Sequence, residues 1–169
     1  MTVGVETRDA DGREAQTMEG VVQEIYIASA GGVAMQKADL VEAVAGCGLR
    51  GDRYMSRTGY WSGSDECQVT LIEGETLDKI AAETNLRVGN GEHRRNIITR
   101  GVRLHELRGK QFAVGEAVLE YDRPRPPCAY IQSITQPGMT RALLGPNGGI
   151  CVRVVKSGVI RPSDKIEVL

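Results

Sequence analysis

The stretch KQFAVGEAVLEYDR, residues 110–123, decides the fold class of this sequence. Its side chains alternate, so that Leu119 and Tyr121 face opposite to Val118, and Gly115 interrupts the alternation near its middle. Alternation on both sides of a glycine is typical of two antiparallel strands joined by a tight turn. The stretch therefore predicts a β-hairpin bent at Gly115.

Short elements are predicted on both sides of this hairpin. Strand-like apolar or alternating runs occupy residues 18–29, 67–73, 95–99, 150–156 and 165–169. Helical spacing or helix-start signals occur at residues 74–85, 102–107, 128–134 and 137–144. Residues 38–45 fit a short strand or a helix equally well. Residues 46–66 are rich in Gly, Ser and charge, and we expect a long binding loop there.

The composition agrees with many short elements. The 169 residues include 21 glycines but only one Trp and one Phe, which suggests frequent turns. We predict a mainly β fold with short helices, built as a β-barrel over residues 18–169. Residues 1–17 are polar and charge-rich, and we expect a disordered N-terminal tail there.

Charge and hydropathy exclude several classes of protein. The formal net charge of -1 argues against a general nucleic-acid binder. No run approaches the ~18 apolar residues of a membrane span, and the N-terminus has no signal-peptide core. The four cysteines show no C-x-x-C spacing, so a structural zinc site is not expected. These features predict a cytoplasmic protein with reduced thiols.

Cys128 is the strongest candidate for a reactive group. Two prolines precede it and a predicted helix follows, so its thiol would lie at a helix N-terminus. Arg123 and Arg125 are close in sequence and would further stabilise a thiolate, which is the form that attacks electrophiles and binds metals. A buried structural cysteine is the alternative interpretation.

A second candidate is the basic segment around residues 93–100. In a strand, Arg94 and Asn96 would point to one face and Arg95 to the other, with Arg100 nearby. A guanidinium and an amide on one face could bind an anion such as phosphate. The alternative is a solvated, charged strand edge.

Two glycine-containing segments carry weaker signals. Asp52 and Arg53 follow Gly51, where an ion pair or a turn is expected. Residues 145–149 (GPNGG) match no phosphate-binding motif and are predicted to form a turn.

Taken together and in order, five segments resemble the MOSC family, the domain found at the C-terminus of molybdenum-cofactor sulfurases. The segments are GLRGDRY (48–54), QVTLIE (68–73), RRNIITRGVRLHEL (94–107), FAVGEAVLEYDRPRPPC (112–128) and GICVRVVKSGVIRPSD (149–164). The resemblance extends over residues 18–169.

The resemblance implies a β-barrel that binds molybdopterin-type cofactor near one cysteine, which maps onto Cys128. That cysteine would ligate molybdenum, in proteins that reduce N-hydroxylated compounds, or accept sulfur from a partner. The cofactor-binding residues would come from three of these segments: Asp52 and Arg53, then Arg94, Asn96 and Arg100, then Arg123 and Arg125. Arg94, Asn96 and Arg100 would hold the cofactor's anionic groups, and Arg123 and Arg125 would stabilise the anionic sulfur. The sequence contains neither the N-terminal barrel domain of the reductases nor the pyridoxal-phosphate desulfurase domain of full sulfurases. The expected partners are therefore a cysteine desulfurase or a molybdoenzyme.

Two other functions fit the same residues. Cys128 could be the nucleophile of a cysteine hydrolase, with His93 or His105 as its base. Alternatively, the basic strand could belong to a non-catalytic module that recognises a partner or RNA.

Overall fold

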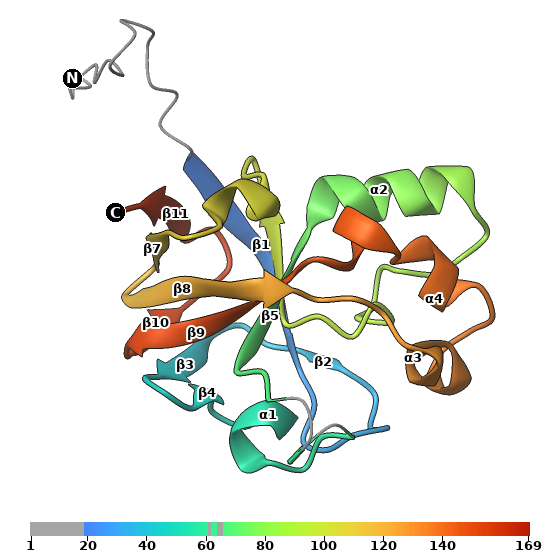
Figure 1. Cartoon of the computed structure of the whole chain (residues 1–169), viewed down its shortest axis with the longest axis horizontal. Helices are drawn as coiled ribbons and strands as arrows, with labels where there is room; N and C mark the ends of the chain where they lie inside the picture. The colour runs from blue at the N-terminus through green and yellow to red at the C-terminus, as the bar shows by residue number, and fades with distance from the viewer. Residues whose placement is uncertain (1–18, 61, 64–65) are drawn as a thin grey trace, which may run out of the picture.

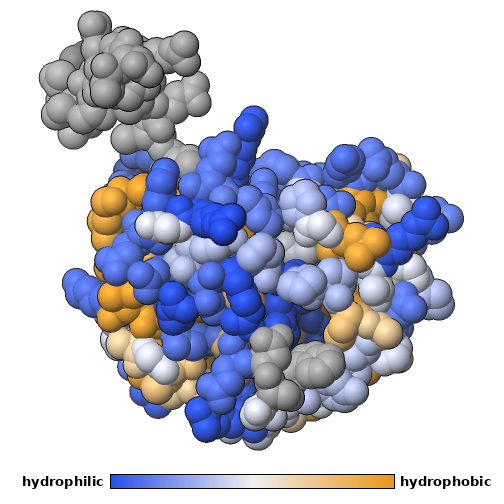
Figure 2. All heavy atoms as spheres, viewed as in Figure 1, coloured by the Kyte–Doolittle hydropathy of each residue, from blue (hydrophilic) through white to orange (hydrophobic). Residues whose placement is uncertain are grey.

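The computed structural model describes residues 19–60, 62–63 and 66–169 (Figure 1). The tail predicted for residues 1–17 lies outside this range. In the described part of the chain, no helix is long and apolar enough to cross a membrane. Figure 2 shows a mostly hydrophilic face on which hydrophobic side chains form separate groups.

Seven strands close into a barrel, which confirms the predicted fold class. In ring order they are β1 (Glu19–Ile27), β11 (Lys165–Val168), β7 (Gln111–Val114), β8 (Ala117–Pro124), β9 (Ile150–Lys156), β5 (Val69–Glu73) and β6 (Ile97–Arg100). The ring closes because β11 pairs with both β7 and β1. Every pairing in it is antiparallel except that between β5 and β6.

The predicted hairpin is β7 and β8, joined at Gly115. Gly115 has a φ of 57°, in the left-handed region that glycine adopts without strain. Phe112 lies opposite Leu119 across the pair, and both are fully buried in the barrel core. The alternation in the sequence therefore reflects one face of the hairpin packing inside the barrel.

Strands β5 and β6 are buried on both faces. Leu71 and Ile97 belong to the barrel core, whereas Ile72 and Ile98 pack against a second core beneath the helices. This double burial explains why two apolar residues follow each other directly in each strand, at residues 71–72 and 97–98. The helix α2 (Gly74–Glu83) makes the crossover between these parallel strands, as the spacing of residues 74–85 predicts.

The second core is formed with short helices at one end of the barrel. Beside α2 lie α3 (Ala129–Ile134) and α4 (Met139–Ala142), which Figure 1 shows at the end of the molecule away from β7 and β11. Ile131, Met139 and Leu143 fill the space between these helices and the sheet. Two 3₁₀ turns, η1 (Leu104–Leu107) and η2 (Gly145–Gly148), complete the connections.

The remaining strands lie outside the ring. β2 (Gln36–Lys37) pairs with β1, and β10 (Gly158–Ile160), β3 (Val41–Val44) and β4 (Gly48–Leu49) form a small sheet. Residues 38–45 thus contribute a strand. The predicted loop over residues 46–66 contains β4 and the short helix α1 (Arg53–Ser56).

Candidate functional site

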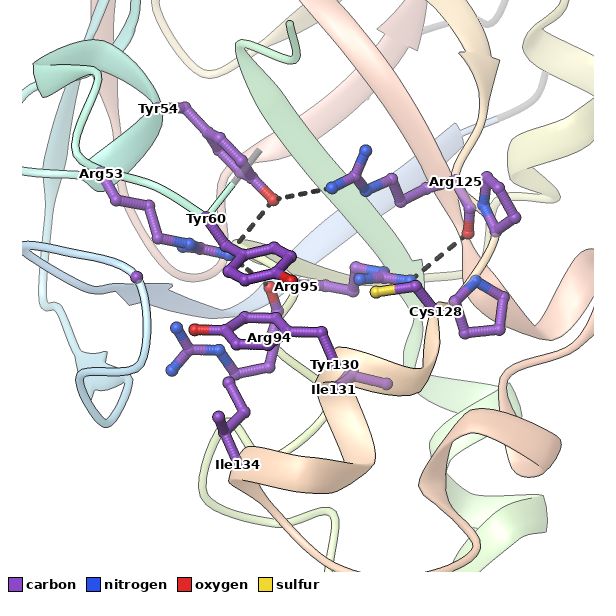
Figure 3. A pocket seen from close by; sticks show the side chains of 13 residues that line it. Arg53, Tyr54, Tyr60, Arg94, Arg95, Arg125, Cys128, Tyr130, Ile131 and Ile134 are labelled. Atoms are coloured by element: carbon purple, nitrogen blue, oxygen red, sulfur yellow. Dashed lines mark hydrogen bonds between the residues drawn. The ribbon is translucent and has the colours of Figure 1, made fainter. Parts of the chain in front are cut away.

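Cys128 lines a pocket where the end of β8 meets the helices (Figure 3). The pocket has a volume of about 260 Å³. Its lining residues come from segments far apart in the sequence: Gly31, Arg53, Tyr54, Tyr60, Arg94, Arg95, Arg125, Pro126, Pro127, Cys128, Tyr130, Ile131 and Ile134.

The chain turns at Cys128 from strand to helix. β8 ends at Pro124, and the two prolines before Cys128 have no N–H with which to extend the strand pairing. Cys128 is extended (φ -130°, ψ 169°) and is the N-cap of α3, as predicted. Thr140 Oγ1 donates a hydrogen bond to the Cys128 carbonyl at 2.8 Å, which fixes the backbone and leaves the half-buried thiol at the pocket.

Four arginines form the cationic part of the pocket: Arg53, Arg94, Arg95 and Arg125. Their exposed fractions are only 5, 7, 4 and 7%. Among the described residues, Asp52 is the only buried carboxylate. The buried side chains here therefore carry an excess of positive charge, which is unfavourable unless an anion accompanies it.

Asp52 organises the first of these arginines. As the N-cap of α1, it accepts a hydrogen bond from the Tyr54 N–H at 3.2 Å. Its Oδ1 accepts from the Ala28 N–H at 3.1 Å and from Arg53 Nη1 at 3.0 Å. Asp52 does not line the pocket, so its role in this geometry is to orient Arg53.

Arg94 and Arg95 both reach the pocket because the chain turns between them. Arg94 has a φ of 65° and donates to the Val33 carbonyl. Arg95 donates from Nε to the Gly148 carbonyl at 2.7 Å and from Nη2 to the Arg125 carbonyl at 3.3 Å. Burial lowers the pKa of Arg95 to about 10, and burial together with Arg53 lowers the pKa of Arg94. Both shifts show that the positive charges are held away from water.

Tyr54 lies between two of the guanidinium groups. Its hydroxyl accepts hydrogen bonds from Arg53 Nη2 at 3.2 Å and Arg125 Nη2 at 3.5 Å, and Figure 3 shows both. Arg53 also lies over the Tyr54 ring, 4.3 Å from its centroid. Tyr54 thus keeps these two like charges apart while contacting each.

Aromatic and apolar side chains form the rest of the pocket lining. Tyr60 and Tyr130 stack with ring centroids 3.8 Å apart and ring planes 11° from parallel. Ile131 and Ile134 of α3 extend this lining. The pocket therefore combines guanidinium groups with aromatic and apolar side chains.

The structure does not place Asn96 or Arg100 in this pocket. Asn96 is fully buried; its Oδ1 accepts from Thr70 and its Nδ2 donates to the Tyr26 carbonyl at 3.1 Å. Arg100 lies at the far end of β6 and pairs with Asp78 at 2.6 Å. The predicted grouping of Arg94 with Asn96 on one strand face is wrong, because β6 begins only at Ile97 and the left-handed turn at Arg94 breaks the alternation.

Arg123 also lies outside the Cys128 pocket. It donates to Asp122 at 2.8 Å and to the Glu66 carbonyl at 3.1 Å, and it lines a separate pocket with His105. Of the predicted arginines, the Cys128 pocket gathers Arg53, Arg94 and Arg125. Arg95, Tyr54 and Tyr130 also line this pocket and were not among the predicted site residues.

Neither histidine lines the Cys128 pocket. His93 is fully buried, and its Nδ1 accepts from the Arg95 N–H at 2.9 Å. His105 contacts the Pro146 carbonyl at 3.1 Å. The geometry therefore provides no Cys–His pair of the kind a cysteine hydrolase needs.

The fold and the site define a class: a small closed β-barrel protein with a thiol in a cationic pocket. Residues 58–167 match the family model of the MOSC domain. The chain belongs to the MOSC domain family, so the resemblance found in the sequence is confirmed. This family is associated with the molybdenum cofactor.

Solved structures show the same fold. YuaD from Bacillus subtilis is similar with a TM-score of 0.73 at 21% identity, over 90% of this chain and 97% of that one. YiiM from Geobacillus stearothermophilus is similar with a TM-score of 0.69 at 15% identity, over 89% of this chain and 75% of that one. YiiM from Escherichia coli is similar with a TM-score of 0.64 at 19% identity, over 90% of this chain and 70% of that one. Comparison with curated protein sequences gave no significant match.

Proposed function

We propose that the Cys128 pocket binds a molybdenum-cofactor-type anion and that the Cys128 sulfur is its reactive group. The observation that carries this proposal is the burial of four arginines around one thiol, with a single buried carboxylate among the described residues. Guanidinium groups are suited to phosphate and other oxyanions, because their planar fork donates two parallel hydrogen bonds.

The donor set fits both ends of such a ligand. Arg53, Arg94, Arg95 and Arg125 would hold its anionic groups, and the stacked Tyr60 and Tyr130 would contact a planar organic part. A soft thiolate is a suitable ligand for molybdenum, and the bound cofactor would supply redox chemistry at that metal. Reduction of N-hydroxylated compounds would be one such reaction.

Sulfur transfer is the second chemistry that the same thiol can perform. The Cys128 thiolate would attack the terminal sulfur of a donor persulfide; the donor S–S bond breaks, the donor leaves as a thiolate, and Cys128 holds the persulfide. The neighbouring guanidinium charges would stabilise the anionic sulfur before and after transfer. A cysteine desulfurase is the kind of partner that provides such a donor, and a molybdoenzyme is the kind that receives the product.

The buried position of the arginines favours a small anion over an extended polyanion. An RNA-binding strand presents its basic side chains along an exposed surface. Here Arg94 and Arg95 are instead 7 and 4% exposed and converge on one pocket.

The test is the molybdenum and pterin content of the protein purified from a host that makes the cofactor. Cys128→Ser is the thiol variant, and Arg100→Met is the matched control, because Arg100 is an arginine outside the pocket. We expect near-stoichiometric pterin in the native protein and in Arg100→Met. Loss of molybdenum in Cys128→Ser would identify the thiol as a metal ligand.

A separate measurement tests sulfur transfer. The apoprotein is incubated with a cysteine desulfurase and cysteine, and persulfide on Cys128 is detected by mass spectrometry. Absence of pterin and molybdenum from every sample, together with no persulfide on Cys128, would contradict the proposal.

A further inference from the structure

Two other cysteines touch each other in the barrel wall. Cys67 lies just before β5, Cys151 lies in β9, and their Sγ atoms are 2.8 Å apart. The two strands are antiparallel neighbours, with Thr70 opposite Cys151. Because an S–S bond is ~2.05 Å long, a small shift of the side chains would bring the sulfurs to bonding distance. Neither cysteine lines the Cys128 pocket.

The two sulfurs differ in their access to solvent. Cys67 lines a second pocket of about 330 Å³, together with Tyr54, Asp122 and Arg153. Cys151 is fully buried behind it. A small molecule in this pocket would therefore meet Cys67 first.

The electrostatic surroundings favour a thiolate on this pair. The Cys67 S–H donates to Cys151, which lowers the pKa of Cys151, and Arg125 and Arg123 act in the same direction. The same hydrogen bond, together with burial, raises the pKa of Cys67. The pair can thus release one proton more readily than an isolated buried thiol and retain the other.

We propose that Cys67 and Cys151 form a redox-active dithiol, which small disulfides oxidise through the second pocket. In the first step the proton that Cys67 donates to Cys151 transfers to the Cys151 sulfur, and the resulting Cys67 thiolate attacks one sulfur of the small disulfide. The S–S bond of the small disulfide breaks, and one small thiolate leaves. In the second step that small thiolate takes up the Cys151 proton, the Cys151 thiolate attacks Cys67 Sγ, and the second small thiolate leaves. Both protein sulfurs are oxidised, and the small disulfide is reduced to two thiols.

A Cys67–Cys151 disulfide would lie near the Cys128 pocket but would not line it. Tyr54 lines both pockets and contacts Arg53 and Arg125. A bond between Cys67 and Cys151 would join the start of β5 covalently to β9 beside this tyrosine. The inference rests on the thiol geometry alone and holds whatever the Cys128 pocket binds.

The experiment uses the full chain with Cys47→Ser and Cys128→Ser, which leaves only the proposed pair. The folded protein is incubated with oxidised glutathione, and free thiols and intact mass are measured. We expect both thiols to be lost, a mass decrease of about 2 Da, and full reversal by dithiothreitol. Peptide mapping should then identify a Cys67–Cys151 crosslink.

A third substitution, Cys67→Ala, provides the matched control. It should abolish the mass decrease while leaving the circular dichroism spectrum unchanged. Two thiols that stay free in the folded protein at equilibrium with oxidised glutathione would overturn the proposal. So would a stable glutathione adduct that never resolves into the internal disulfide.

Discussion

The barrel core and the Cys128 pocket are both buried, yet they are filled by opposite kinds of side chain. The core contains apolar residues such as Phe112, Leu119 and Ile166, each fully buried. The pocket contains four arginines that are as inaccessible as many core residues. Burial of apolar groups stabilises a fold, whereas burial of unmatched charge opposes it. The difference teaches that the core is organised for stability, whereas the pocket keeps its positive charge at a cost in stability, as the proposed anion site requires.

The largest effect on stability is expected in the core. Phe112→Ala removes a fully buried ring at the centre of the hairpin packing. The free energy of unfolding should fall by ~3–5 kcal/mol, from lost burial and the remaining cavity. Urea denaturation measures this change. A decrease below ~1 kcal/mol would mean that the barrel core is not packed as described.

A pH effect should come from His93, which is fully buried and accepts a hydrogen bond from the Arg95 N–H. Burial, then Arg95 and Arg94, lower the pKa of His93 from 6.5 to about 3. Because only the unfolded chain takes up the proton between these two pH values, the stability conferred by neutral His93 is complete above pH 6.5. Below pH 6.5 the free energy of unfolding should decrease by ~1.4 kcal/mol for each pH unit, until the pH approaches 3.

The matched variant for this pH effect is His93→Asn, whose side-chain oxygen can still accept from the Arg95 N–H. Denaturation curves at several pH values should show a smaller loss of stability in the variant between pH 6.5 and pH 4. Identical losses in both proteins would show that His93 is not held neutral by burial.

In the pocket, Arg95→Met should affect binding more than stability. The substitution keeps an unbranched side chain and removes a buried charge, although the Gly148 and Arg125 carbonyls each lose a donor. Affinity for molybdate or phosphate should fall by ~10-fold or more, while the free energy of unfolding changes less than in Phe112→Ala. Isothermal titration calorimetry, with Arg100→Met as the control, measures the affinity. Equal losses in the two variants would mean that binding depends on overall charge.

The smallest effect is expected at the aromatic wall. Tyr60→Leu removes the stack with Tyr130 but keeps an apolar side chain at the pocket. Aromatic pairs contribute ~0.5–1.5 kcal/mol, and Tyr60 is 58% exposed, so the loss of stability should lie near the lower value. Thermal denaturation measures it. A loss as large as that of Phe112→Ala would place Tyr60 in the structural core.

The sequence predicted the elements of this fold better than it predicted the site. Alternation identified the β7–β8 hairpin, and helical spacing identified α2, because each pattern reflects one buried face. Cys128 was located correctly at a helix N-terminus from its two prolines. These features depend on neighbours in the chain, which is the information that a sequence carries directly.

Features that depend on tertiary contacts were not predictable in the same way. Arg94 has a left-handed φ, and Arg95 rather than Asn96 lines the pocket. The periodicity of the sequence does not predict a turn of this kind. The contact between Cys67 and Cys151 joins residues 84 positions apart. Tyr54 meets Arg125 only because α1 folds toward the end of β8. The last two contacts join segments that are far apart in the sequence and meet only in the folded chain.

Protection of Cys128 from alkylation tests most directly whether the thiol and the arginines form one anion site. Iodoacetamide modification of Cys128 is followed by mass spectrometry with and without molybdate, in the native protein and in Arg95→Met. We expect molybdate to slow the alkylation of Cys128 in the native protein. At the same molybdate concentration, this slowing should be at least ~10-fold smaller in Arg95→Met. Modification rates that molybdate leaves unchanged in the native protein would contradict this expectation.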